Sequence, residues 1–308
     1  MTPDLSIVIL NFNTGDYLKK CLESIYQSQL KHQIEVIVVD NASTDDSIDQ
    51  AKKLDFKSKK ILDSRFLILD SNLGFAQGNN QGIKLVNPQS RYVLFLNPDT
   101  TVNSDTLSGT IDYLDSHPKI DAATVNVVFV KTGQTQPECH RGFPSPGNAF
   151  FHFFLPFLPK IFPKSKLFNG YFLGHLDFNQ PQIIDACVGA FIVLKKRVGE
   201  TVGWWCPDYF FYGEDLDLCY QIQQHGFKLW YLPQYQIHHF QGISSGVNNA
   251  TSKASRSTKI KIAKASTDAM RIFYRRNLLH HYSPLSQKII LFGIKLLELQ
   301  RLFKAKYL

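Results

Sequence analysis

The chain has 308 residues, of which 44% are hydrophobic, enough for one large domain or two closely joined domains with a substantial core. Its net charge of +8 is unevenly distributed: residues 251–308 carry thirteen Lys or Arg and two acids, whereas residues 1–250 carry 21 basic and 24 acidic groups. This distribution argues against a body that binds nucleic acid, and it predicts a basic tail that meets an anionic surface.

The cysteines and the apolar runs bear on the compartment. Five cysteines without paired spacing favour reduced thiols over a disulfide framework. Residues 1–4 lead directly into a short apolar run, so we expect no signal peptide. No stretch reaches the roughly 18 apolar residues of a transmembrane helix. Together these features favour a cytoplasmic protein.

The first hundred residues alternate short apolar runs with segments of helical spacing. The spacing predicts a helix over residues 16–27, and Ser43 or Thr44 can cap a helix that continues into the early fifties. Repeated units of this kind predict an α/β fold with a mostly parallel central sheet and helices on both faces. The expected strands are residues 5–10, 35–39, 66–69 and 92–96.

Every strand expected in this half ends in Asn or Asp. Because ligands of α/β sheets lie beyond the carboxyl ends of parallel strands, we expect these side chains to meet one. A carboxylate there can hold a divalent cation, which in turn can bind a diphosphate. Turn formation would explain one such pair, but not the whole set. The side chains are Asn11, Asn13, Asp40, Asn41, Asn72, Asn97 and Asp99.

After Pro118 the pattern is looser, with strands expected at residues 122–130 and 190–195. Between them, residues 149–158 form an aromatic run interrupted by proline. This run could be core, a lid over an acceptor site or a loop that dips into a membrane. Core is the default expectation, because phenylalanine is usually buried.

The last segment, residues 285–308, repeats apolar residues at helical spacing among lysines and an arginine. This pattern predicts a basic amphipathic helix, which could lie on a membrane surface or pack on the body. The apolar positions are Ile289, Phe292, Leu296, Leu299 and Phe303.

Seven segments in order along the chain carry a resemblance to a known family. They are residues 8–13, 38–45, 72–82, 96–100, 189–190, 209–219 and 239–244. The series spans about four-fifths of the chain and resembles family 2 glycosyltransferases of the GT-A fold, in particular the bacterial rhamnosyltransferase-like branch that builds cell-surface polysaccharides. Two segments depart from the usual pattern, residues 188–190 and 203–207, and both leave the donor sugar open.

The resemblance implies a Rossmann-like GT-A domain over residues 1–250, followed by a basic helical C-terminal tail over 251–308. Residues 1–100 would form the nucleotide-sugar-binding half, and residues 101–250 the acceptor and catalytic half. The implied reaction is inverting transfer of a sugar from a nucleotide diphosphate donor (UDP, dTDP or GDP), assisted by Mn²⁺ or Mg²⁺. The implied acceptor is a saccharide, lipid-linked, at the inner face of a cell membrane.

The donor residues implied by the resemblance lie mainly at the strand exits. Asp40 and Asn11 would contact the nucleobase or ribose. The glycines of residues 72–82 would let the backbone approach the ribose and phosphates, or form a turn into a helix. The indole pair at 204–205 could stack on a sugar or simply be packed. The full set is Asn11, Asn13, Asp40, Asn41, Asn72, Gly74, Asn79, Asn97, Trp204 and Trp205.

Asp99 matches the last acidic position of the family's metal motif, and Asn97 replaces the first. One carboxylate suits Mg²⁺ or Mn²⁺ when a diphosphate supplies further oxygens. His239 matches the family's late histidine, either as a nitrogen ligand or as a structural residue.

Glu214 and Asp215 precede a predicted helix, where acids also favour the helix dipole. Inverting transfer needs a carboxylate that takes a proton from the acceptor hydroxyl. The resemblance assigns this role to Asp215, with Glu214 as the fallback. A nucleotidyltransferase is a rival, although residues 11–16 lack the basic phosphate loop of such enzymes. A non-catalytic nucleotide- or carbohydrate-binding protein is another.

Overall fold

The computed structural model describes residues 2–54, 58–240 and 256–307. Within them, nine strands form one sheet in the order β3-β2-β1-β4-β8-β6-β9-β5, with β7 paired to β9. The strands are β1 (Leu5–Asn11), β2 (Ile34–Asp40), β3 (Ile61–Ile68), β4 (Tyr92–Leu96), β5 (Thr100–Val102), β6 (Ala122–Phe129), β7 (Gln182–Ile184), β8 (Phe191–Lys195) and β9 (Leu229–His239). The α-helices are α1 (Asp16–Tyr26), α2 (Ser47–Lys52), α3 (Gly74–Ile83), α4 (Thr106–Ser116), α5 (Pro146–Phe154), α6 (Phe157–Ile161), α7 (Lys196–Val202), α8 (Glu214–Gln224), α9 (Arg256–Phe273) and α10 (Pro284–Tyr307).

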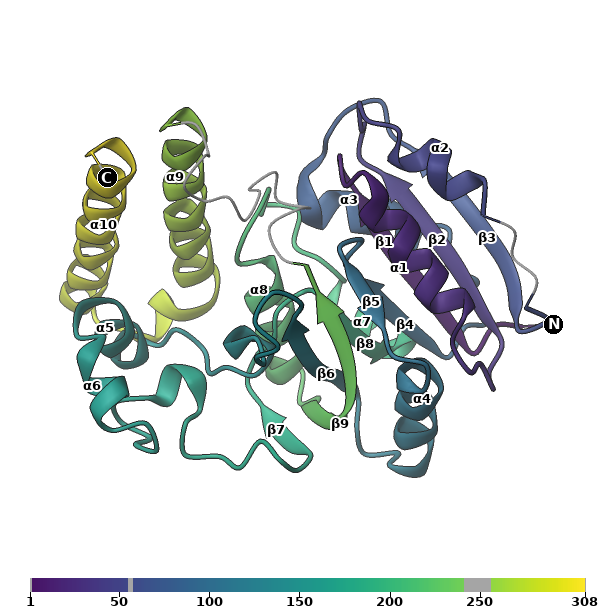
Figure 1. Ribbon diagram of the computed structural model, residues 1–308. Coiled ribbons are helices and arrows are strands. Elements are labelled where there is room, and N and C mark those ends of the chain that lie inside the picture. Colours follow the sequence, from purple (N-terminus) through teal and green to yellow (C-terminus); the bar gives the residue numbers. More distant parts are fainter. Residues whose placement is uncertain (1, 55–57, 241–255, 308) are drawn as a thin grey trace.

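The N-terminal half is the expected parallel unit. β1 pairs in parallel with β2 and β4, and β2 with β3, so four strand exits share one edge. β1 and β2 are buried along their whole length, because helices cover both faces. In Figure 1, α1 and α2 lie on one face of these strands and α3 on the other. The prediction of a mostly parallel α/β sheet is confirmed, and an antiparallel continuation begins at β8.

Two local expectations need correction. α2 begins at Ser47 with Asp46 at its N-cap, and neither Ser43 nor Thr44 caps it. Ser43 is used in the loop instead, where its hydroxyl donates to Asp40 Oδ1 at 2.6 Å. β3 begins at Ile61, earlier than expected, because the polar residues 63–65 interrupt the apolar run of this half-buried strand.

Glycines in α3 allow this helix to lie close to the sheet. A Cβ on Gly78 would be 2.5 Å from Leu10 Cδ1, and one on Gly82 would be 2.5 Å from Val8 Cγ1. Only a hydrogen fits in either place. The close packing brings the start of α3 next to the exits of β1 and β2.

A second apolar cluster joins α8 to the C-terminal helices. It contains Tyr209 and Tyr220 together with Phe273 and Tyr274 from the tail. Asn277 ties the two parts further, because its Nδ2 donates to Asp217 Oδ1 at 2.6 Å and its backbone oxygen accepts from Tyr220 at 3.0 Å. This cluster includes residues from both sides of the division expected at residue 250, which itself lies outside the described residues.

The aromatic run at residues 149–158 is not core, contrary to the default expectation. It forms α5 and the start of α6, and Phe150, Phe154 and Phe157 are 50%, 40% and 54% exposed. α5 and α6 lie beside α9 and α10, at the end of the molecule far from β3 (Figure 1).

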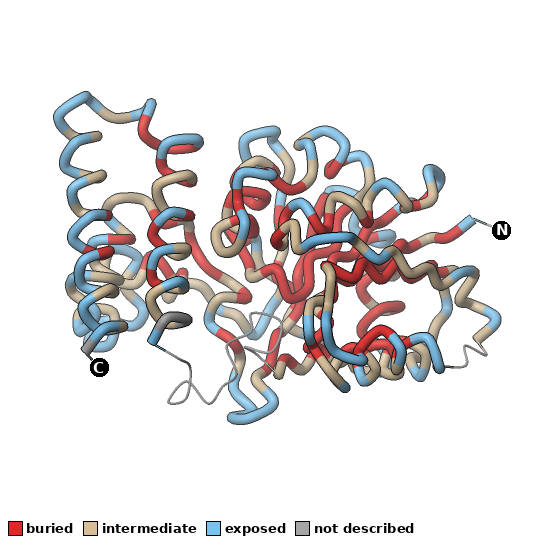
Figure 2. Tube along the Cα trace, turned by 90° about the horizontal axis from the view of Figure 1, so that it is seen from above, coloured by how far each residue is buried: buried red, intermediate tan, exposed pale blue. Residues whose placement is uncertain are grey.

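α10 packs on α9 with its inner residues and exposes its outer ones. Ile294 and Leu297 are buried, whereas the five apolar residues of the expected amphipathic pattern are each more than 40% exposed. Figure 2 shows this contrast, with buried residues gathered in the sheet and exposed turns along α10. The tail thus packs on the body and still presents an apolar outer face.

Candidate active site

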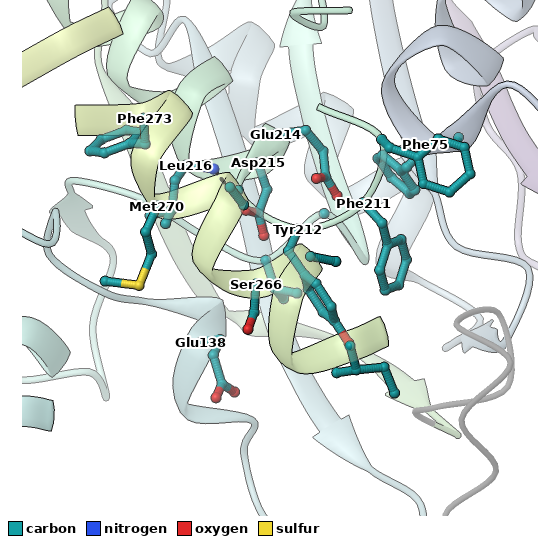
Figure 3. A pocket seen from close by; sticks show the side chains of 18 of the residues that line it. Phe75, Glu138, Phe211, Tyr212, Glu214, Asp215, Leu216, Ser266, Met270 and Phe273 are labelled. Carbon is teal, nitrogen blue, oxygen red and sulfur yellow. Dashed lines mark hydrogen bonds between the residues drawn. The ribbon is translucent and has the colours of Figure 1, made fainter. Parts of the chain in front are cut away.

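A cleft of about 890 Å³ lies between the strand exits of the N-terminal half and the helices α8 and α9. Asn41, Asn72 and Asn97 line it from the strand exits, and Glu214 and Asp215 line it from the first turn of α8. Figure 3 shows these two carboxyl groups between Phe75 on one side and the α9 residues Met270 and Phe273 on the other. The cleft therefore joins the region where a donor was expected to the expected catalytic acids.

The first two strand exits are joined by hydrogen bonds. Asn11 and Asp40 are register partners of β1 and β2, and Asn11 Nδ2 donates to Asp40 Oδ1 at 2.8 Å. The other carboxylate oxygen of Asp40 accepts from the Ser43 backbone N–H at 3.0 Å. Asn13 Oδ1 accepts from the Thr44 backbone N–H at 2.7 Å. The parallel register thus brings these residues together, and their side chains hold the loops after β1 and β2.

The next residues connect the strand exits to the loop before α8. Asn41 Nδ2 donates to Asn72 Oδ1 at 2.9 Å and to the Gly74 carbonyl at 3.2 Å. Gly74 has φ +80°, and a Cβ there would be 2.5 Å from the Phe210 carbonyl oxygen. That oxygen accepts from the Phe75 backbone N–H at 2.9 Å. Glycine is therefore required at position 74 by the left-handed backbone and by the close contact with the Phe210 carbonyl oxygen.

The expected donor residues divide into two groups. Asn41, Asn72, Gly74 and Asn97 line the cleft, whereas the others expected from the sequence do not. Trp205 is fully buried and packs against Phe95 and Phe75, with ring centroids 4.8 and 5.2 Å apart, and Trp204 packs against Phe95 at 6.1 Å. Packing is thus the alternative that the structure supports for both indoles. The residues outside the cleft lining are Asn11, Asn13, Asp40, Asn79, Trp204 and Trp205.

Asp99 and His239 meet although they are distant in sequence. β5 pairs antiparallel with β9, which sets Thr100 opposite His239. As a result His239 Nε2 lies 3.4 Å from Asp99 Oδ1. His239 Nδ1 donates to Gln136 Oε1 at 2.8 Å, which leaves Nε2 on the side of Asp99. The rest of the matching segment, residues 241–244, lies outside the described residues.

This pair fits a divalent cation that also binds a diphosphate. A carboxylate oxygen and a neutral imidazole nitrogen are both ligands of Mn²⁺. Gln136 accepts a hydrogen bond from the other ring nitrogen of His239 and so orients the ring. The described residues contain no cluster of three or more His, Cys, Asp or Glu side chains that could hold a metal alone. The remaining ligands would have to come from substrate oxygens and water.

The turn before α8 holds an unusual backbone. Tyr212 and Gly213 have φ of +72° and +82°, and the left-handed conformation costs a non-glycine residue about 1–2 kcal/mol. This turn directs Glu214 and Asp215 into the cleft from the first turn of the helix. Strain of this kind concentrates at functional sites.

Asp215 forms a buried ion pair with Arg141. Arg141 Nη2 donates to Asp215 Oδ2 at 2.8 Å, and both side chains are largely shielded from water. Arg141 is held by paired backbone hydrogen bonds with Ala186, at 2.9 and 2.8 Å. Burial acts to lower the pKa of the guanidinium, but Asp215 and other neighbours raise it overall, so Arg141 stays charged.

Glu214 differs from Asp215 because it has no ion-pair partner among the described residues and its pKa is raised. Burial, and then the charge of Asp215, raise the pKa of the Glu214 carboxyl to about 8. Glu214 Oε2 is buried and has no hydrogen-bond partner within the described residues. At neutral pH the cleft therefore holds one protonated carboxyl group beside one ion-paired carboxylate.

Arg141 and Gln136 were not anticipated from the sequence. They lie in the loop after β6, which carries no motif of the resemblance. The available signal was weak: residues 136–141 combine Gln, Glu, Cys, His and Arg in a short segment between strands. Their partners, His239 and Asp215, are distant in sequence, so only the fold identifies the pairs.

Comparison with known proteins agrees with this geometry. Residues 6–195, more than half of the chain, match the family model described as glycosyl transferase family 2. The chain is 25% identical over 242 residues to the rhamnosyltransferase WbbL of Escherichia coli (strain K12), which covers 76% of this chain and 82% of that protein.

Among solved structures, the mannosyltransferase PcManGT from Pyrobaculum calidifontis, in complex with GDP-Man and Mn²⁺, aligns with 99% of this chain and 73% of its own (TM-score 0.58, 16% identity). GalNAc-T7 with UDP, GalNAc and Mn²⁺ aligns with 77% of this chain (TM-score 0.54, 17% identity), and the chain spans 44% of that protein. At these identities the likeness shows the fold, which is GT-A. With the matched family model, it follows that the chain belongs to glycosyl transferase family 2.

Proposed function

We propose that this glycosyltransferase is inverting and metal-dependent, and that it transfers a sugar from a nucleotide diphosphate donor to a lipid-linked saccharide in cell-surface polysaccharide biosynthesis. The observation that carries the proposal is the Asp215 carboxylate, ion-paired to Arg141 in the cleft that Asn41, Asn72 and Asn97 also line. A base and a donor region share one cavity.

Asp215 is the proposed general base. Inverting transfer requires a carboxylate that takes the proton of the acceptor hydroxyl as the hydroxyl attacks the anomeric carbon from the face opposite the leaving diphosphate. Arg141 Nη2 donates a hydrogen bond to Asp215 Oδ2 at 2.8 Å, and the backbone N–H of Leu216 donates one to Asp215 Oδ1 at 2.7 Å. Glu214, protonated at neutral pH, is placed to donate a hydrogen bond to donor or acceptor.

The strand exits are the proposed donor site. Asn41, Asn72 and Asn97 offer amide groups to ribose and phosphate oxygens, and the Asn11–Asp40 pair holds the loops that carry them or contacts the base. Asp99 and His239 would hold Mn²⁺ or Mg²⁺. Such a cation supplies charge that offsets the negative charge developing on the leaving diphosphate. The nucleotide diphosphates and Mn²⁺ in the two GT-A neighbours support a UDP, dTDP or GDP donor.

The outer face of α10 supports the proposed membrane surface. Its apolar residues, from Ile289 to Phe303, are exposed and lie among lysines, as in helices that bind anionic lipid. The exposed phenylalanines of α5 lie at the same end of the molecule. In the described residues, no helix is both long and apolar enough to cross a bilayer. We therefore place the enzyme peripherally at the inner face of the membrane, with no nucleic acid partner.

Replacing the base tests the proposal directly. In Asp215→Asn, turnover should fall by about 10²–10⁴-fold, because the amide cannot accept the proton. Binding of the nucleotide diphosphate should persist, since the strand exits are unchanged. Turnover that survives the substitution would contradict the assignment of the base. A nucleotidyltransferase would instead release pyrophosphate from a nucleoside triphosphate and a sugar phosphate.

A further inference from the structure

Three cations from separate parts of the chain line the part of the cleft that α9 walls. Arg141 comes from the loop after β6, Lys261 from α9 and Arg301 from α10. α9 and α10 stand apart from β1 and β2, whose exits form the proposed donor site (Figure 1).

Arg301 is a half-buried cation without a carboxylate. Its Nη1 donates to Ser266 Oγ at 2.7 Å, and its guanidinium lies 5.3 Å from the centroid of the Phe153 ring. No ion pair joins it to an acid in the described part of the chain. Burial lowers the pKa of this guanidinium, which is the cost of removing a charge from water without a counter-ion.

Arg141 is an almost fully buried cation that lines the same cleft. It is only 9% exposed, its Nη2 bonds Asp215, and its buried Nε has no partner within the described residues. Arg301 and Arg141 approach the same pair of rings. The Phe153 ring, which Arg301 contacts, lies 6.0 Å from that of Tyr171, and the Tyr171 carbonyl accepts from the backbone N–H of Gly142, the neighbour of Arg141, at 2.8 Å. Two guanidinium groups thus converge on one chamber.

The acids of the cleft do not neutralise this end. Asp215 is paired with Arg141, and Glu214 is protonated at neutral pH. Glu138 is the remaining carboxyl group among the lining residues that the structure describes, against the free charges of Lys261 and Arg301. An excess of positive charge in a cleft attracts an anionic ligand.

The wall beside these cations is apolar. Met270 and Phe273 of α9 and Pro144 line it, and Figure 3 shows the first two on the side of Asp215 away from Phe75. We propose that this end of the cleft binds the phosphate or diphosphate of the acceptor, held by Arg301 and Lys261 with Arg141 adding its positive charge, and with the first apolar units of its lipid against α9. This inference rests on the proposed function and specifies its substrate as a phosphate-linked lipid.

The placement accounts for the position of the base. Guanidinium groups bind phosphate oxygens in pairs of parallel hydrogen bonds, and the ammonium of Lys261 adds a point charge. A sugar attached to a phosphate at this site would extend toward Asp215. The donor would approach the same carboxylate from the strand exits. The acceptor and the donor would thus meet at Asp215 from opposite ends.

Titration calorimetry with geranyl diphosphate, a soluble short-chain lipid diphosphate, tests the site in the full chain. We expect binding that persists when GDP, UDP or dTDP with Mn²⁺ is already bound. Arg301→Gln and Lys261→Gln should each weaken it about tenfold or more, as expected for loss of a charge-assisted contact. Lys304 is an exposed cation that lies on α10 like Arg301 but does not line the cleft, so Lys304→Gln should leave the affinity for geranyl diphosphate unchanged.

Control ligands distinguish a site for a lipid diphosphate from a site for any diphosphate or any lipid. Geraniol should not bind, and inorganic pyrophosphate should bind more weakly than geranyl diphosphate. Equal affinity for the two diphosphates would overturn the lipid-linked assignment. Displacement by the nucleotide, wild-type affinity in both glutamine variants, or no binding to wild type would overturn the site itself. Lys261 is exposed, so its variant should fold even if that of Arg301 does not. Failure of the nucleotides alone to bind would instead count against the proposed function.

Discussion

His239 Nε2 lies 3.4 Å from Asp99 Oδ1 because the antiparallel pairing of β5 with β9 sets Thr100 opposite His239. The distance is too long for a strong hydrogen bond. Gln136 fixes the imidazole from the other side at 2.8 Å. The sheet thus holds together the two side chains that the proposed metal site requires.

We expect metal-dependent stabilisation to require this pair. A nucleotide diphosphate at a hundred times its dissociation constant, with Mn²⁺, should stabilise the wild type by roughly 2.7 kcal/mol, readable as a rise in melting temperature. In Asp99→Ala the metal-dependent part of the rise should be lost, and in His239→Ala it should be reduced. His238→Ala is the control, because alternate residues of a strand face opposite sides. An equal rise with and without Mn²⁺ in wild type would refute the metal site.

The raised pKa of Glu214 predicts how stability depends on pH. Because the folded protein holds this proton up to about pH 8 and the unfolded chain releases it near 4.5, the contribution of Glu214 is fully present below pH 4.5. It decreases as the pH rises toward 8 and is constant above that value. The Glu214→Gln variant cannot ionise, so its free energy of unfolding should fall less than that of wild type over this range.

Denaturant titrations at several pH values would measure the difference. Glu138→Gln is a suitable control, since Glu138 lines the same cleft but is less buried than Glu214. It should follow the wild-type dependence. Parallel curves for wild type and Glu214→Gln would show that Glu214 titrates normally.

Gly74 joins the proposed donor site at the strand exits to the loop before α8, which contains Phe210. Substitution of Gly74 should disturb the donor site and this loop. Gly74→Ala would place a Cβ 2.5 Å from the Phe210 carbonyl oxygen at φ +80°. Gly133→Ala is matched in backbone, with φ +67°, but has open space around the new Cβ. We expect the control to cost about 1 kcal/mol and Gly74→Ala about 2–3 kcal/mol, with weakened nucleotide binding only in the latter. Equal losses would show that the contact with Phe210 is unimportant.

The exposed face of α10 should bind anionic membranes. Burying an apolar side chain of this size contributes about 1.5–3 kcal/mol. The double variant Phe292→Ser with Leu296→Ser should therefore bind anionic liposomes with an affinity lowered by about 100-fold, as measured by co-sedimentation. The inner face of α10 packs on α9, which makes point substitutions preferable to deletion of the helix. Gln300→Ser, also exposed on α10, is the control. Unchanged liposome binding by the double variant would contradict the membrane assignment.

Local pattern was sufficient to predict the elements of the N-terminal half. Alternating apolar runs and helical spacing predicted the parallel strands, because strands that are buried on both faces, such as β1 and β2, are nearly continuous apolar runs. Asn and Asp at the strand exits marked the correct edge of the sheet. The motif series predicted the family and the positions of Glu214 and Asp215. All of these depend on residues close together in the chain.

Only the tertiary structure decided the rest, because it depends on contacts between residues distant in sequence. The pairing of β5 with β9 brings His239 to Asp99, and the loop after β6 brings Arg141 to Asp215. Composition predicted a buried aromatic run, yet Phe150 and Phe154 of α5 are exposed and only Ala149 of the run is buried. Charge predicted a basic tail, but only packing could show that Arg301 faces inward while Phe292 faces solvent. Periodicity specifies the faces of a helix, and the fold determines which face is covered.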